Sequence, residues 1–192
     1  MFDRRKETMQ IKPVILGLLA IGITASSAAA QTTTSSPAET KAVQLAGGAS
    51  AISETHGSWT VNCQIVNNTR VCSSSFQQFD GKNQRVFAIE VSPRESGASG
   101  NAALPFGLAL NKGVILVIDD KPVGETRQFS TCLLLGCLIP LSFDAASLDA
   151  LNRGNTLKLK AVASDTGKEI EFSVPLKGFS SALKRSGALL AE

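Results

Sequence analysis

The sequence predicts an all-β protein, an antiparallel β-sandwich of the immunoglobulin-like type with two short helices. Several short segments alternate apolar and polar side chains with the two-residue period of half-buried strands, and tight-turn residues separate them. Only two segments, 144–154 and 179–183, space their apolar residues as helices do. Many short strands within one block of roughly 140 residues are typical of a two-layer β fold.

The composition is that of one globular domain with a sizeable core. The chain has 192 residues, of which 43% are hydrophobic and 18% are charged. Its formal net charge is +3, and the basic side chains of residues 1–30 supply most of that excess. The rest of the chain has no basic field for nucleic acid, so we expect no nucleic-acid partner.

Residues 1–30 have the three parts of a secretory signal peptide. A basic start is followed by an apolar run over 14–23 and by small residues that end at Ala30. We expect cleavage after Ala30 and export to the periplasm, the cell surface or the medium. The alternative is a retained membrane anchor, but a spanning helix needs about 20 apolar residues. After cleavage we expect no transmembrane segment, a flexible linker over 31–53, and one domain over 54–192.

Four cysteines in an exported protein are expected to form two disulfides, because oxidising compartments preserve them. Three pairings are possible, and the spacing favours Cys63–Cys72 and Cys132–Cys137, each placed symmetrically about a short turn. If residues 67–68 form a two-residue turn, the register puts Cys63 directly opposite Cys72, with Cα atoms roughly 4.5 Å apart. A disulfide can bridge that distance.

The same register predicts a row of aromatic side chains on the disulfide face. It places Trp59 opposite Phe76, and a turn over 80–83 would place Phe76 opposite Phe87. The opposite face of these strands carries polar side chains, so one face is expected to be dry and the other wet. Residues 92–103 are rich in Gly, Ser and Ala, and they are predicted to form a loop.

Two further strands are predicted in the middle of the chain. Residues 104–110 alternate apolar and small or polar side chains, as a half-buried strand does. The β-branched run over 114–118 indicates a strand that is buried on both faces. Residues 119–122 then turn the chain.

The C-terminal third is predicted to contain a capped helix, a hairpin and a terminal helix that packs back on the sheet. Asp144 can cap the first helix and Gly154 can end it. In the hairpin, a turn around 166–167 would place Ala161 opposite Phe172, with apolar side chains on one face and lysines and glutamates on the other.

Several of these segments resemble the invasion-associated locus B family of exported Gram-negative proteins. The resemblance depends on residues 57–63, 70–72, 104–110, 129–137 and 174–179. It implies a small β-sandwich in the periplasm or at the cell surface, with a link to host-cell invasion. The family supplies no catalytic residues that could be assigned here.

The sequence shows no catalytic or metal-binding constellation, so we expect neither an enzyme nor a cofactor. The single histidine, His56, has only Glu54 and Ser58 beside it, which does not make a nucleophile with an oriented base. The spacing of the cysteines differs from that of redox Cys-x-x-Cys motifs. The acidic residues at 119–120 and Asp165 are too few for a calcium loop and are interpreted as turn residues.

Leu133, Leu134 and Leu135 are the residues that fit a simple structural interpretation least well. If Cys132 pairs with Cys137, these leucines lie at the tip of a tight loop and face water. Our hypothesis is that they dock on a partner protein or on an envelope or host-surface component. The alternative is that they fold under the terminal helix and join the core.

These observations favour an exported, non-enzymatic binding protein of the bacterial envelope, linked by resemblance to host-cell invasion. The alternative function is that of a periplasmic structural or quality-control factor for envelope integrity. The two differ in location, because a surface-exposed chain fits the first and strict retention in the periplasm fits the second.

Overall fold

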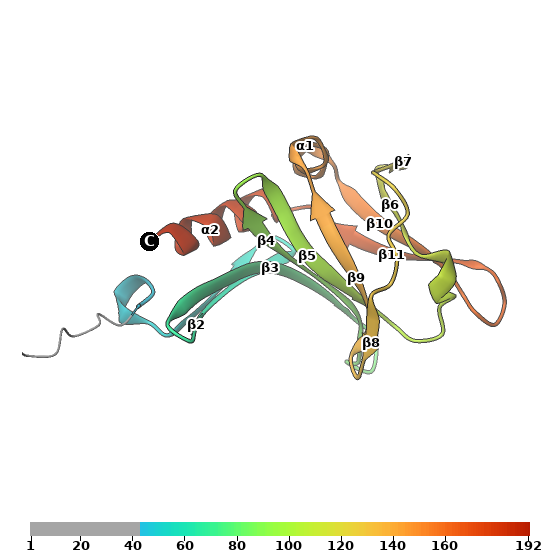
Figure 1. Cartoon of the computed structure of the whole chain (residues 1–192), viewed down its shortest axis with the longest axis horizontal. Helices are drawn as coiled ribbons and strands as arrows, with labels where there is room; N and C mark the ends of the chain where they lie inside the picture. Colours follow the sequence, from blue (N-terminus) through green and yellow to red (C-terminus); the bar gives the residue numbers. More distant parts are fainter. Residues whose placement is uncertain (1–42) are drawn as a thin grey trace, which may run out of the picture. The chain divides into compact units, whose positions relative to one another are not determined.

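The computed structural model describes residues 43–192. The expected signal peptide and most of the expected linker lie outside the described residues. The described chain folds into two antiparallel β-sheets with two short α-helices, which confirms the predicted fold class (Figure 1).

The larger sheet has seven strands, in the order β1 (Ala51–His56), β2 (Trp59–Val66), β3 (Thr69–Phe79), β4 (Arg85–Arg94), β5 (Gly97–Leu104), β9 (Gly136–Phe143) and β8 (Thr131–Leu133). The smaller sheet has four, in the order β11 (Glu169–Pro175), β10 (Thr156–Val162), β6 (Ile115–Ile118) and β7 (Lys121–Pro122). The helices are α1 (Ala145–Arg153) and α2 (Phe179–Ala191), with the short 3-10 turns η1 (Ala46–Gly48) and η2 (Leu110–Lys112).

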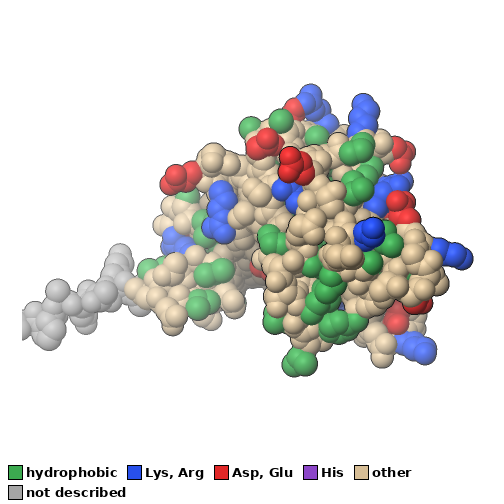
Figure 2. Space-filling model, turned by 45° about the vertical axis from the view of Figure 1, so that its right-hand side comes forward, with side chains coloured by type: hydrophobic (Ala, Val, Ile, Leu, Met, Phe, Trp, Pro, Cys, Tyr) green, Lys and Arg blue, Asp and Glu red, His purple; other side chains and the backbone are tan. Residues whose placement is uncertain are grey.

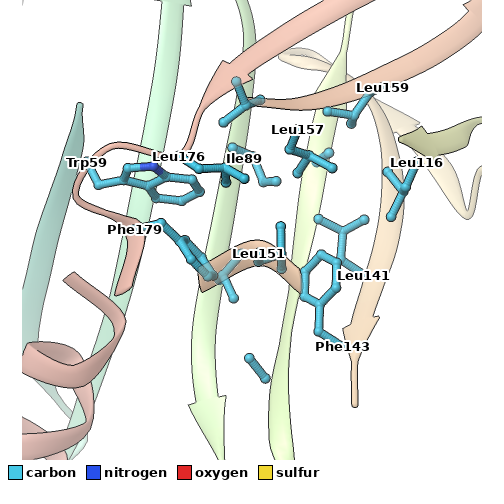
Figure 3. Packing of buried hydrophobic residues seen from close by; sticks show 14 of the residues in the cluster. Trp59, Ile89, Leu116, Leu141, Phe143, Leu151, Leu157, Leu159, Leu176 and Phe179 are labelled. Atoms are coloured by element: carbon cyan, nitrogen blue, oxygen red, sulfur yellow. The ribbon is translucent and has the colours of Figure 1, made fainter. Parts of the chain in front are cut away.

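One face of the larger sheet is covered by the smaller sheet and by α2. In Figure 1, α2 lies above the arch that β2, β3 and β4 form. Figure 3 shows side chains from both sheets and both helices meeting in one core. The rings of Trp59 and Phe179 are 4.9 Å apart, and those of Phe87 and Phe172 are 5.3 Å apart. Aromatic pairs at these distances stabilise a core beyond the area that they bury.

The first hairpin has the predicted register. Asn67 and Asn68 form the turn with positive φ angles of 49° and 58°, a conformation that Asn tolerates better than most residues. Cys63 lies opposite Cys72 with the two Cα atoms 4.1 Å apart, and the two sulfurs are bonded. The buried Trp59 lies with its ring 6.3 Å from that of Phe76.

The register of the second hairpin differs from the prediction by two residues. Phe76 lies opposite Ile89 instead of Phe87, because the ladder shifts at a bulge near Gln78 and Phe79. A shift by an even number keeps every side chain on its predicted face. The rings of Phe76 and Phe87 are therefore still neighbours, 5.9 Å apart, although they are not directly opposite.

The prediction of a loop over 92–103 is wrong. Strand β4 continues to Arg94, and β5 pairs with β4 on one side and with β9 on the other. Small residues suit this position because the backbones approach closely: a Cβ at Gly100 would collide with the carbonyl oxygen of Glu90. The Gly, Ser and Ala residues that suggested a loop are therefore the small residues that a crowded central strand needs.

The boundary predicted for the linker at residue 53 is also too late. Strand β1 begins at Ala51, and the amide of Ile65 donates a hydrogen bond to the carbonyl of Ser50. Leu45 is already buried in the core. The folded part therefore includes residues that the sequence pattern assigns to the linker.

Of the strand predicted over 104–110, Leu104 is the last residue of β5, and the rest is reduced to one isolated bridge between Leu108 and Ala163. Gly107 has a positive φ of 88°, which interrupts an extended strand, and Phe106 is exposed. The neighbouring strand predicted over 114–118 is confirmed as β6, which begins at Ile115. Ile115 is exposed, whereas Val114 and the three residues after Ile115 are buried.

The last hairpin is also shifted by two residues, with Leu159 opposite Phe172 and Ala161 opposite Ile170. Its turn is longer than predicted, because the amide of Ala163 donates to the carbonyl of Lys168. Both helices are confirmed. The carboxylate of Asp144 accepts a hydrogen bond from the Ser147 amide at the start of α1, and Gly154 follows its last residue. Helix α2 packs on the larger sheet as expected.

Candidate functional site

The β8–β9 hairpin carries three leucines into solvent. Cys132 and Cys137 lie opposite each other and form the second disulfide, with Leu134 and Leu135 in the turn. The exposed fractions of the side chains are 55% for Leu133, 97% for Leu134 and 73% for Leu135. The alternative that these leucines fold under the terminal helix is wrong, because α2 packs on β2, β3 and β4 instead.

Two phenylalanines from other parts of the chain lie beside this turn. Phe79, at the end of β3, is 50% exposed, and Phe106, in the loop after β5, is 62% exposed. Together with Leu134 and Leu135 they surround a hollow of about 500 Å³. Figure 2 shows hydrophobic side chains gathered on the lower part of the visible face. We call these two phenylalanines and the three leucines, residues 133–135, the apolar end.

The backbone beneath the apolar end is held by several contacts. The disulfide closes the hairpin, and a Cβ at Gly136 would collide with the Leu104 carbonyl, so β5 and β9 approach closely there. Arg85 Nη2 donates a hydrogen bond to the carbonyl oxygen of Leu135 at 3.2 Å. The leucines are therefore presented by a fixed turn that has few alternative conformations.

One cation, Arg85, lies beside the apolar end. Among residues 43–192, no carboxylate forms a salt bridge with Arg85. The neighbouring Asp80 directs one carboxylate oxygen into its own turn, where it accepts hydrogen bonds from the Lys82 and Gln84 amides, both at 2.8 Å. The guanidinium of Arg85 therefore lies at the rim of the hollow with donors to spare.

A second, polar hollow of about 550 Å³ lies on the outer face of the larger sheet. Ser53 donates to Asn62 at 3.1 Å, and Asn62 donates to Ser75 at 3.2 Å, so hydroxyl and amide groups connect three strands. This is the face that the alternation in the sequence predicts to be wet. Gln77 and Arg85 line both hollows, so the polar groove ends where the apolar end begins.

The structure places His56 in the contact between β1 and α2. Its Nε2 is 3.4 Å from a carboxylate oxygen of Glu54, and Arg185 holds the same carboxylate through two hydrogen bonds of 2.9 Å. The Arg185 guanidinium keeps the pKa of Glu54 below its ordinary value. These contacts hold α2 against β1 at the edge of the larger sheet. His56 is therefore part of a structural contact.

The acidic residues considered for calcium are turn residues, as predicted. The carboxylate of Asp119 accepts hydrogen bonds from the backbone amides of Asn155 and Thr156, which lower its pKa. Asp120 pairs with Lys158 at 2.9 Å. Residues 43–192 contain no group of three or more potential metal ligands.

Comparison with known proteins identifies the family. A family profile described as "Invasion associated locus B (IalB) protein" matches residues 59–187. The chain belongs to the invasion-associated locus B family. This result confirms the resemblance that the sequence motifs indicate.

Three members of the family show how far the similarity extends. An invasion protein B homolog of Brucella abortus (strain 2308) is 41% identical over 150 residues, which cover 77% of this chain and 86% of that protein. Invasion protein B of Bartonella bacilliformis is 34% identical over 158 residues, 80% of this chain and 85% of that protein. The crystal structure of invasion associated protein b from Bartonella henselae matches at 34% identity with a TM-score of 0.68, covering 73% of this chain and 97% of that chain.

These relatives are named as invasion proteins, and none of the three names is that of an enzyme. In the described part of this invasion-associated locus B chain, no helix has the length and apolar character to cross a bilayer.

Sequence reasoning found the leucines of the apolar end but missed three neighbours. The strand predicted over 104–110 includes Phe106, and Phe79 and Arg85 lie opposite each other beside the bulge between β3 and β4. The one available signal was the run 105–107, where proline and glycine flank Phe106 and so indicate a turn with an exposed aromatic residue.

Proposed function

We propose that this member of the invasion-associated locus B family is an exported, non-enzymatic protein of the bacterial envelope that works by binding, with the apolar end as its contact surface. One observation carries the proposal: Leu134 is 97% exposed on a hairpin that a disulfide holds closed. A rigid turn that exposes three leucines costs solubility, and that cost is removed when a partner covers them.

The contact can supply useful binding energy. Complete burial of a leucine or phenylalanine side chain stabilises by about 1.5–3 kcal/mol, and the apolar end has five such side chains in various states of exposure. Only part of that energy becomes affinity, because association also costs translational and rotational freedom. The rigidity of the stapled turn reduces the further cost of ordering the contact surface.

Export is supported by two independent features. The disulfides Cys63–Cys72 and Cys132–Cys137 persist in oxidising compartments. The pattern of residues 1–30 is that of a cleaved signal peptide. The proposed location is therefore the periplasm or the cell surface, and the names of the relatives suggest a role connected with host-cell invasion.

The test is site-specific crosslinking in living cells that produce the full chain. A photoreactive side chain is introduced at position 134, and in a matched variant at position 170, where Ile170 is also exposed but lies on β11. The proposal expects crosslinked products from position 134 and few from position 170. Equal yields from the two positions would contradict it. The location of the products, periplasmic or surface-exposed, separates the binding role from a periplasmic quality-control role.

A further inference from the structure

We infer that the apolar end docks on an anionic lipid surface, with the leucine turn among the acyl chains and Arg85 at the headgroups. This inference rests on the proposed function and names the partner chemistry for the same surface. Arg85, which forms no salt bridge with a carboxylate among residues 43–192, donates a hydrogen bond to Leu135 directly beside Leu134, the most exposed leucine.

The composition of the apolar end favours lipid over a protein partner. Protein interfaces concentrate their binding energy in Trp, Tyr and Arg, whereas Leu is under-represented among such residues. This chain has no tyrosine, and its single tryptophan, Trp59, is buried in the core. The exposed side chains are three leucines and two phenylalanines, which a hydrocarbon layer accommodates without shape complementarity.

One backbone carbonyl of the turn already has a hydrogen-bond donor that it would need in a lipid environment. An unpaired carbonyl in hydrocarbon is costly, because no water is available to donate a hydrogen bond to it. In this turn the carbonyl of Leu135 accepts a hydrogen bond from Arg85, and Leu133 pairs with Gly136 in the β8–β9 ladder. Shallow insertion of the turn therefore leaves that carbonyl satisfied.

The positive charge of Arg85 favours anionic over neutral lipids. Arg85 has donors beyond the one that it uses for Leu135, and among the described residues no carboxylate neutralises it through a salt bridge. Guanidinium groups bind phosphate through paired hydrogen bonds. Lys82 lies in the adjoining turn, whose Asp80 binds backbone amides of that turn. An anionic phospholipid surface therefore offers both the hydrocarbon and the phosphate that the apolar end can contact.

The experiment is co-sedimentation of the oxidised mature chain with two kinds of vesicle, phosphatidylcholine alone and phosphatidylcholine mixed with phosphatidylglycerol. We expect binding to the mixed vesicles, weakened about tenfold by Leu134→Ser, since one leucine side chain leaves the hydrocarbon. The matched control Ile170→Ser removes an exposed apolar side chain from β11 and is expected to bind like the wild type. Arg85→Gln should lose the preference for anionic vesicles, and Arg85→Lys should keep it.

Two outcomes would overturn the inference. Wild-type protein that binds neither vesicle, or a Leu134→Ser variant that binds as well as wild type, would exclude lipid docking by this turn. If position 134 still crosslinks to a protein in cells, the binding function survives and its partner is that protein. If position 134 crosslinks no more than position 170, the proposed function itself fails.

Discussion

Trp59 Nε1 donates a hydrogen bond of 2.9 Å to the carbonyl oxygen of Pro175, a residue 116 positions later in the chain. This bond joins the two sheets. The indole belongs to β2 of the larger sheet, and the carbonyl ends β11 of the smaller one. The ring is fully buried and packs edge-on against Phe179 at the start of α2. One side chain therefore connects both layers and the terminal helix.

Truncation of this side chain should be the most damaging single change in the core. We expect Trp59→Ala to lower the free energy of unfolding by about 3–5 kcal/mol, since it leaves a large cavity. Trp59→Phe keeps most of the apolar contact but leaves the Pro175 carbonyl without its donor, for an expected loss of about 1–3 kcal/mol. Urea unfolding followed by far-ultraviolet circular dichroism measures both, because the variants lack the only tryptophan. A Trp59→Phe variant as stable as the wild type would show that the hydrogen bond to Pro175 contributes nothing.

The two disulfides should differ in what they support. Cys63 and Cys72 are buried in the core, so replacing both by alanine is expected to cost about 2.5 kcal/mol of unfolding free energy from loop entropy. Replacing Cys132 and Cys137 should cost about 2 kcal/mol or less and chiefly loosen the apolar end. Unfolding curves and crosslinking yields from position 134 separate the two effects. A larger stability loss from the 132–137 pair than from the 63–72 pair would contradict this assignment.

A buried pair of hydroxyl groups should show an asymmetric response. Ser74 and Ser186 are both fully buried with their oxygens 2.8 Å apart, and Ser186 also donates to the Ala182 carbonyl at 3.0 Å. Ser186→Ala leaves the Ser74 hydroxyl unpaired, for an expected loss of about 1–3 kcal/mol, whereas Ser74→Ala should cost about 1 kcal/mol. A double-mutant cycle should be non-additive. Additive losses would mean that the two hydroxyls act independently.

The contact of α2 with β1 should weaken in acid. The Arg185 guanidinium lowers the pKa of Glu54 below its ordinary value of 4.5. The pair therefore stabilises the fold fully above that value, and its contribution is lost as the pH falls through the lower pKa of the folded state. Glu54→Gln should flatten the pH dependence of the unfolding midpoint below pH 4.5 and lower the midpoint at neutral pH. An unchanged slope in the variant would show that another carboxylate dominates.

Local sequence rules predicted the features of the fold that depend on neighbouring residues. The Asn67–Asn68 turn fixes the first register, and Asp144 and Gly154 fix the ends of α1, because each acts on backbone within a few residues of itself. The other two registers were each wrong by two residues. A bulge near Phe79 and a longer turn after Val162 caused the errors, and neither has a marked sequence signal.

The strand β5 was missed for a physical reason. Its small residues reflect crowding by β4 and β9, which only the assembled sheet imposes, so the sequence of the segment resembles a loop. In the candidate site, too, the contacts between distant segments could not be predicted from the sequence of any one segment. The exposure of Leu134 and Leu135 follows from the cysteine spacing, but their proximity to Phe79, Phe106 and Arg85 depends on how distant segments meet.

The most direct test of the account combines crosslinking and folding in one variant, Leu134→Asp. Because the side chain is 97% exposed, we predict a free energy of unfolding within about 0.5 kcal/mol of wild type. We predict that the folded variant, treated with a chemical crosslinker on living cells, no longer recovers the partner that the wild-type chain recovers under the same treatment. A folded variant with undiminished recovery would contradict the claim that the apolar end is the contact surface.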